Sequence, residues 1–126
     1  MRHTRTARGR LHVSGAANKT ETRYAAELEA RKLAGEILWY RFEGFKVRLA
    51  DGAFYTPDYA LMTADGMLEC HEVKAGKIDA GGTLQMLCEE ASKVRVKVAA
   101  EMYPFAFRFA VERPRKAGGG FVLTEV

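Results

Sequence analysis

The chain has 126 residues and a mass of 14.0 kDa, which suffices for one hydrophobic core but not for two sizeable ones. Hydrophobic residues make up 48% and charged residues 29% of the chain, close to the averages of soluble globular domains, so composition indicates no disordered, fibrous or membrane protein. The longest apolar-rich run, Phe105–Val111, is interrupted by Arg108 and is far shorter than the roughly 20 residues of a membrane-spanning helix. We therefore expect no membrane partner.

The net charge of +4 is concentrated at the N-terminus. Residues 1–20 carry +5 and no acidic residue, so the remainder of the chain sums to −1. We predict a basic, disordered arm over 1–17 and one folded domain over 18–126. The arm's arginines could neutralise phosphates and give salt-dependent affinity for nucleic acid, although a solvated end without a partner is equally compatible with this composition. The arginines are Arg2, Arg5, Arg8 and Arg10.

The two cysteines, Cys70 and Cys88, lie in a predicted strand and a predicted helix. At such positions a cysteine is more often a small buried hydrophobe than half of a disulfide. The N-terminal arginines are not followed by an apolar segment, so they are not typical of a secretory signal. We expect a reducing, cytoplasmic location.

A first helix is predicted over 19–34, with Asn18 as N-cap, Glu21 completing a capping box and Gly35 just beyond the last turn. Two strands follow, in the segments "EILWYRFE" and "FKVRLA", the second of which alternates apolar and charged residues as a half-buried strand does.

The next segment, "YTPDYALMTADGMLECHEVKA", predicts two strands at about 54–63 and 67–75. A two-residue turn would place Asp58 and Glu72 on opposite faces, because strand side chains alternate. A three-residue loop over 64–66 pairs them instead. We favour this loop because it gathers the apolar residues near the turn on one face. It requires Gly66 in the left-handed conformation, and it pairs Ala60 with Cys70 and Met62 with Leu68.

A second helix is predicted from about Thr83 to Tyr103, ended by Pro104. Its predicted core face is one apolar stripe, made of Leu84, Leu87, Ala91, Val94, Val98 and Met102. The alternating segment "FAFRFAVE" and the final "FVLTEV" predict two more strands. The expected order is α-β-β-β-β-α-β-β, an α/β domain.

The paired hairpin places Asp58, Glu72 and Lys74 on one face. Cleaving a phosphodiester develops negative charge that a hard divalent cation offsets, while the same cation lowers the pKa of a bound water. Magnesium prefers a few carboxylate oxygens with water, so Asp58, Glu72 and the Val73 carbonyl suit it. Lys74 could orient the attacking water or stabilise the pentavalent centre; a role as general base stays open.

The residues "TPD" at 56–58 and "EVK" at 72–74 resemble the signature of the PD-(D/E)XK nuclease superfamily. The preceding segment "NKTETRYAAELEARKLAGEI" is similar to the leading helix of its phage endonuclease I and Holliday-junction-resolvase-like branch. In that branch a helical glutamate, here Glu21, reaches the metal site. The resemblance covers roughly 18–104. It implies a restriction-endonuclease-like core, α-β-β-β-α-β, with a central mixed sheet flanked by helices.

The resemblance also implies Mg²⁺ or Mn²⁺ as cofactor, with Asp58, Glu72, Val73 and Glu21 as ligands and Lys74 assisting catalysis. We therefore predict a metal-dependent endonuclease acting on DNA in a bacterial host cell, with branched DNA or Holliday junctions as the implied substrate. Resolving a junction needs two symmetric cuts, most simply made by a homodimer. A nuclease for linear DNA and a binding module without catalysis are the alternatives, followed by a plain interaction domain.

Several of these residues also have ordinary structural explanations. Helix capping alone would account for Glu21. A cross-strand ion pair would account for Asp58 and Lys74. Lys93 and Lys97 could approach a phosphate from the second helix, but Glu89 offers Lys93 a helical ion pair. On the opposite strand face we expect His71 to be a packing or surface residue and Glu69 to be solvated.

Overall fold

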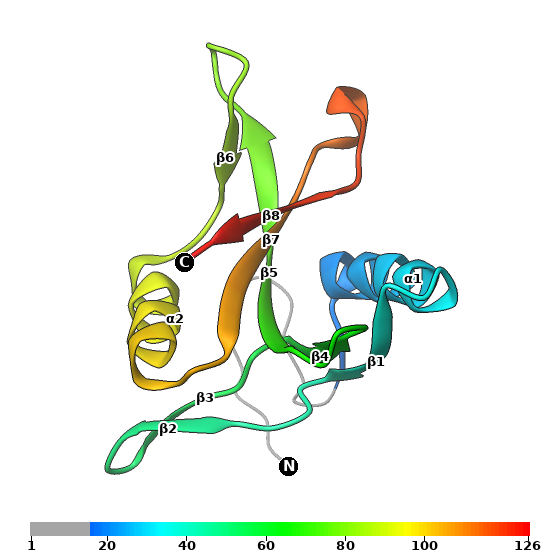
Figure 1. Ribbon diagram of the computed structural model, residues 1–126. Coiled ribbons are helices and arrows are strands. Elements are labelled where there is room, and N and C mark those ends of the chain that lie inside the picture. Colours follow the sequence, from blue (N-terminus) through cyan, green and yellow to red (C-terminus); the bar gives the residue numbers. More distant parts are fainter. Residues whose placement is uncertain (1–15) are drawn as a thin grey trace.

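The computed structural model describes residues 16–126, and Arg2, Arg5, Arg8 and Arg10 of the predicted arm lie outside these residues. In the described chain the helix α1 is followed by six strands, the helix α2 and two further strands (Figure 1). The elements are α1 (Lys19–Leu33), β1 (Ile37–Phe42), β2 (Val47–Ala50), β3 (Ala53–Tyr55), β4 (Tyr59–Thr63), β5 (Leu68–Ile78), β6 (Leu84–Met86), α2 (Glu90–Met102), β7 (Ala106–Glu112), the 3₁₀ turn η1 (Arg115–Ala117) and β8 (Phe121–Glu125).

A mixed sheet forms the centre of the fold, in the order β1-β4-β5-β7-β8, with β6 added to the far half of β5. The β5–β7 pair is parallel, whereas the other neighbours are antiparallel. The short β2–β3 hairpin stands apart as a two-stranded sheet. The predicted α/β class with a central mixed sheet is confirmed.

Each helix covers one face of this sheet. Side chains of β5 alternate between the two faces, so successive β5 residues pack against different helices. Cys70 of β5 packs on the α2 side with Val96, Phe107 and Phe109. Val73 packs on the α1 side with a second buried group, which contains Tyr24, Leu28, Tyr59, Leu61 and Ala110. Both cysteines are free. No helix in residues 16–126 is long and apolar enough to cross a membrane.

The first helix forms as predicted, because its signals are local. The Glu21 N–H donates to Asn18 Oδ1 at 2.8 Å and the Asn18 N–H donates to Glu21 Oε1 at 2.9 Å, which completes the capping box. At the other end Gly35 has φ +82°, the left-handed geometry of a residue that ends a helix.

The β4–β5 hairpin has the predicted register. Ala60 pairs with Cys70 and Met62 with Leu68, and Gly66 has φ +88° in the loop. The first arm is shorter than predicted, since the stretch expected at 54–63 is divided between β3 and β4. Pro57 stands at the division, where its missing N–H cannot join a ladder.

The prediction for the second helix was wrong in two respects. The helix begins at Glu90, because Leu84–Met86 instead pairs with the part of β5 that extends beyond β7. The predicted core stripe is also turned outward: Val94 is 54% exposed, and Leu87, Val98 and Met102 are exposed too.

The buried face of α2 carries Ser92, Val96 and Ala99. This helix side packs on Phe107 and Phe109. Small residues such as Ala99 let a helix approach bulky aromatic side chains closely, so packing with β7 selected this stripe over the more apolar one.

Candidate functional site

Asp58 lies immediately before β4, at the end of its ladder with β5. Continuing the β4–β5 register by one residue places Asp58 opposite Glu72. The Val73 N–H donates to Asp58 Oδ2 at 2.8 Å, and the Glu43 N–H donates to the Asp58 carbonyl at 2.8 Å. Hydrogen bonds therefore hold both the side chain and the backbone of Asp58 in place.

The environment of Asp58 is strongly unfavourable to its negative charge. Burial raises the pKa of Asp58 well above its usual range, and the charges of Glu72 and Glu21 raise it further. The Val73 N–H and the charge of Lys74 act in the opposite direction. The structure thus brings together four of the residues singled out in the sequence: Glu21, Asp58, Glu72 and Lys74.

Glu72 is 8% exposed and both of its carboxylate oxygens have protein partners. The Tyr55 hydroxyl donates to Oε1 at 2.6 Å, and Lys74 Nζ lies 3.3 Å from Oε2. Burial and the neighbouring Glu72 raise the pKa of Tyr55, so this hydroxyl remains a neutral donor. Glu72 therefore belongs to a small polar cluster on the α2 face of the sheet.

Glu21 approaches this cluster from the first turn of α1. It is buried, and its Oε1 is the acceptor in the capping box. The Tyr59 hydroxyl donates to the Glu21 carbonyl at 2.8 Å, which ties the start of α1 to β4. The capping explanation is confirmed, and the same contacts hold Glu21 where its charge acts on Asp58.

The Val73 carbonyl points to the same side of β5 as the Val73 N–H. In a strand the N–H and C=O of one residue point to the same neighbouring strand. Since the Val73 N–H reaches Asp58, its carbonyl points to that side too, beyond the end of β4. One strand carbonyl is therefore directed to the side of β5 on which Asp58 lies.

The two helix lysines are placed differently. Lys93 Nζ pairs with Glu90 at 3.6 Å, whereas the sequence suggested Glu89. The charges of Lys74, Glu72 and Lys93 all act on the partly buried thiol of Cys88. Lys97 is one helical turn further on and is exposed.

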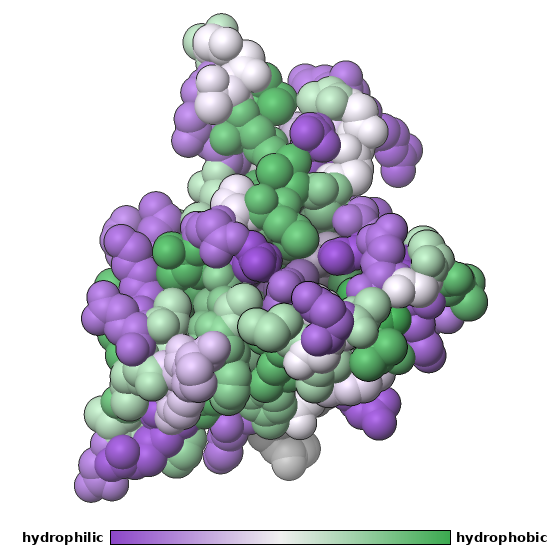
Figure 2. Space-filling view, in the orientation of Figure 1, coloured by the Kyte–Doolittle hydropathy of each residue, from purple (hydrophilic) through white to green (hydrophobic). Residues whose placement is uncertain are grey.

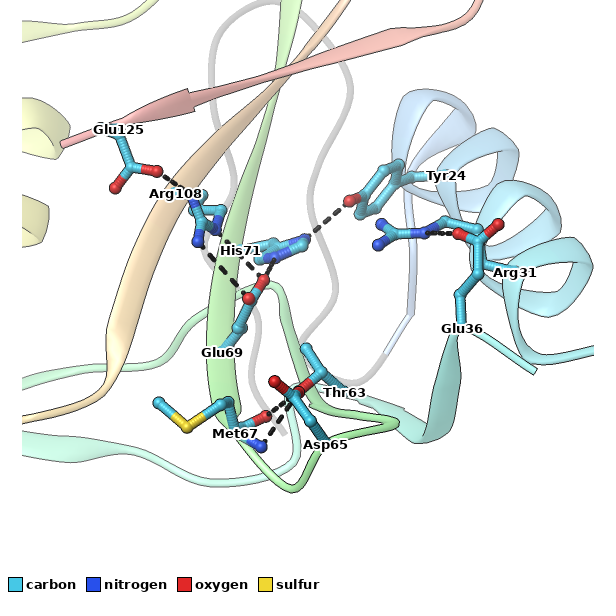
Figure 3. Close-up of polar contacts among 10 residues, drawn as sticks. All are labelled: Tyr24, Arg31, Glu36, Thr63, Asp65, Met67, Glu69, His71, Arg108 and Glu125. Atoms are coloured by element: carbon cyan, nitrogen blue, oxygen red, sulfur yellow. Dashed lines mark hydrogen bonds and ion pairs between the residues drawn. The ribbon is translucent and has the colours of Figure 1, made fainter. Parts of the chain in front are cut away.

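A different polar network occupies the α1 face of β5 (Figure 3). The Tyr24 hydroxyl lies 2.6 Å from His71 Nδ1, and His71 Nε2 lies 2.9 Å from Glu69 Oε1. Arg108 bonds to Glu69 at 3.2 Å and also pairs with Glu125. His71 is a buried packing residue, which was one of the two alternatives expected for it. The expectation of a solvated Glu69 was wrong, because the Glu69 side chain is only 13% exposed.

The protonation of this network follows from its surroundings. The hydrogen bond from His71 and then that from Arg108 lower the pKa of Glu69 to about 2, so Glu69 is ionised. Burial lowers the pKa of His71 and favours the neutral ring. A neutral ring beside a carboxylate donates from Nε2 to Glu69 and accepts from Tyr24 at Nδ1. The network thereby fastens α1, and with it Glu21, to β5.

Within residues 16–126 no group of three or more His, Cys, Asp or Glu side chains is arranged to hold a metal ion. The carboxylates of Glu21, Asp58 and Glu72 each bond to the protein instead. Their chemistry nevertheless suits a hard cation, because the charges of Glu72 and Glu21 oppose the ionisation of Asp58, and a divalent charge beside these carboxylates would offset that repulsion. Carboxylate and carbonyl oxygens, as in Asp58, Glu72 and Val73, are the donor types that Mg²⁺ and Mn²⁺ prefer.

Sequence reasoning missed the two tyrosines that hold the cluster. Tyr55 and Tyr59 flank the "TPD" segment, yet an aromatic residue beside an acidic motif gives no signal of the carboxylate or carbonyl that its hydroxyl will contact.

Comparisons with protein-family models, with curated proteins and with solved structures gave no match to this chain.

Proposed function

We propose that this protein is a metal-dependent endonuclease that hydrolyses phosphodiester bonds in DNA. The observation that carries this proposal is the placement of the partly buried Asp58 beside the buried Glu72 and Glu21, with Lys74 at 3.3 Å from Glu72. Such a cluster is costly to fold, because like charges are held together away from water. Sites that perturb carboxylates this strongly are often catalytic.

The order of the elements supports the proposal. A core of α1, β1, β4, β5, α2 and β7 follows the α-β-β-β-α-β sequence of elements that the restriction-endonuclease-like fold requires. In this core three antiparallel strands are followed by a parallel one, so the sheet is mixed. The β2–β3 hairpin, β6 and β8 are then additions to that core.

Asp58, Glu72 and the Val73 carbonyl would hold Mg²⁺ or Mn²⁺, with Glu21 ordering its outer waters or a second ion. When bound, this metal would supply a water of lowered pKa and positive charge for the phosphoryl oxygens. The Tyr55 hydroxyl, at 2.6 Å from Glu72, keeps that carboxylate oriented.

Lys74 would act on the substrate through its charge. Its Nζ at 3.3 Å from Glu72 places an ammonium group beside the carboxylates, on the strand face that carries the site. An ammonium group donates hydrogen bonds and accepts none, so Lys74 would orient the attacking water and stabilise the charge of the pentavalent centre.

A non-catalytic nucleic-acid-binding module on the same scaffold is the second candidate. It is favoured by one observation, that all three carboxylates already have protein partners.

Cleavage of a labelled four-way junction and of its matching linear duplex tests the proposal. Each substrate is incubated with wild type and Lys74→Ala, in Mg²⁺ or in EDTA, and Lys32→Ala on the exposed surface of α1 is the matched control. We expect cleavage by wild type and the control in Mg²⁺ only, and its loss in Lys74→Ala. Faster cleavage of the junction would identify a resolvase, and equal rates a nuclease for linear DNA. Binding without cleavage by wild type would refute the nuclease and leave the binding module.

A further inference from the structure

Two connections leave the central sheet at the same end. β5 and β7 run parallel and their last pair is Ala75 with Glu112, so the C-terminal ends of both strands lie at the same end of the sheet. Beyond that end the chain forms the β5–β6 hairpin and the β7–β8 loop, which both project upward in Figure 1.

The β7–β8 loop, residues 113–120, is strongly basic. Arg113, Arg115 and Lys116 are all exposed, and no acidic residue occurs between Arg113 and Thr124. No ion pair found within residues 16–126 involves these three side chains. Figure 2 shows the hydrophilic side chains gathered around this loop at the upper right.

The loop has a defined internal structure. The Arg113 N–H donates to the Gly120 carbonyl at 2.9 Å, and Pro114 accepts from Ala117 at 2.9 Å and from Gly119 at 3.1 Å. The three consecutive glycines, 118–120, all have positive φ, which lets the chain fold back at low steric cost. These bonds give the backbone that carries the three cations a defined conformation.

The acidic residues near the loop are engaged elsewhere. Glu112 forms two bonds to Arg23, at 2.6 and 2.8 Å, on the α1 face of the sheet. Asp79 at the tip of the β5–β6 hairpin accepts from the N–H groups of Gly81 and Thr83 and from the Gln85 amide. These contacts leave the three loop cations without a neutralising carboxylate.

The register of β5 and β7 fixes the distance from the loop to the candidate site. Lys74 pairs with Val111 and Glu72 with Phe109, so Arg113 begins the loop two residues beyond the level of Lys74 and four beyond that of Glu72, or about 7 and 13 Å at the rise of a strand. Val111, the last β7 residue on the α2 side, packs with the same core as Cys70, and Arg113 follows it by two residues. Glu72 and Lys74 share this face.

We propose that Arg113, Arg115 and Lys116 form a phosphate-binding prong, which holds the DNA backbone next to the phosphodiester at the candidate site. The inference rests on the proposed function, because that function makes DNA the ligand. Successive charges on one DNA strand are about 3.4 Å apart along the helix axis, so the prong would contact phosphates within a few nucleotides of the scissile bond. Its contacts carry no sequence information and fix the position of the duplex.

The test is the salt dependence of DNA binding by the full chain in EDTA, measured by fluorescence anisotropy with a labelled linear duplex of about 30 base pairs. The prong variant carries Arg113→Gln, Arg115→Gln and Lys116→Gln. The matched control carries Arg41→Gln, Lys46→Gln and Arg48→Gln, three exposed cations on β1 and the β2–β3 hairpin. Thermal unfolding verifies that both variants are folded.

Each phosphate contact contributes about 0.9 to the magnitude of the slope of log K against log salt. The magnitude of this slope should therefore fall by about 2 to 3 in the prong variant and by less than about 1 in the control. Equal losses in the two variants would mean that only net charge matters, and an unchanged slope in the prong variant would mean that the loop does not touch DNA. Either result overturns the prong while leaving cleavage by wild type, and hence the proposed function, intact. Absence of salt-dependent binding by wild type would overturn both.

Discussion

Replacing Glu69 by glutamine should change the pH dependence of stability in a defined window. The folded protein holds the pKa of Glu69 at about 2, below its ordinary 4.5, through His71 and Arg108. A carboxyl group with a lowered folded pKa stabilises the protein above its unfolded pKa, and that contribution is lost as pH falls through the folded pKa. The difference between the unfolded and folded pKa of Glu69 corresponds to about 3 kcal/mol of unfolding free energy. Solvent screens little of this contribution, because the Glu69 side chain is only 13% exposed.

Urea unfolding followed by circular dichroism gives the required free energies at pH 7, 5, 4 and 3. Glu69→Gln should be less stable than wild type by up to about 3 kcal/mol at pH 7, and the difference should shrink steadily between about pH 5 and pH 2. The control is Glu36→Gln, which removes an exposed ion pair with Arg31, and it should change stability by less than about 1 kcal/mol. A wild-type-to-Glu69→Gln difference that stays constant from pH 7 to pH 3 would refute the network described here.

Three further substitutions test separate features. Val96→Ala should lower the free energy of unfolding by about 1 to 3 kcal/mol and Val94→Ala by less than about 0.5 kcal/mol, and equal losses would contradict the observed orientation of α2. Asn18→Ala removes the side-chain cap of α1 and should cost about 0.5 to 2 kcal/mol in the same measurement, whereas an unchanged value would contradict the capping box. Tyr55→Phe removes the donor to Glu72 and should slow cleavage in Mg²⁺ about 10-fold or more, while an undiminished rate would show that Tyr55 does not orient that carboxylate.

Features with local causes could be predicted from the sequence. The first helix begins and ends at signals within a few residues of its termini, Asn18 with Glu21 and Gly35. The β4–β5 register followed from the apolar pattern together with Gly66, because a one-residue slip would turn every side chain of the strand to the wrong face. That register alone placed Asp58 opposite Glu72.

Features decided by contacts between distant segments could not be predicted. α2 carries two apolar stripes, and only its packing against Phe107 and Phe109 selects the one with Val96 and Ala99. Leu84–Met86 is a strand because β5 extends beyond β7 and offers it an edge. Glu69 is shielded from solvent because Arg108, 39 residues further along the chain, lies beside it on β7. In each case the deciding partner is remote in sequence.

The most direct test of the central claim is the rate of DNA cleavage as a function of Mg²⁺ concentration, for wild type and Asp58→Asn. Asparagine keeps the shape of the side chain and its acceptor for the Val73 N–H but cannot ionise to bind a cation. Asp51→Asn, at the exposed β2–β3 turn, is the control. We predict a saturable Mg²⁺ dependence for wild type and the control, with cleavage by Asp58→Asn slower by about 10² to 10³. Cleavage in EDTA, or equal rates for wild type and Asp58→Asn, would contradict a metal-dependent site at these carboxylates.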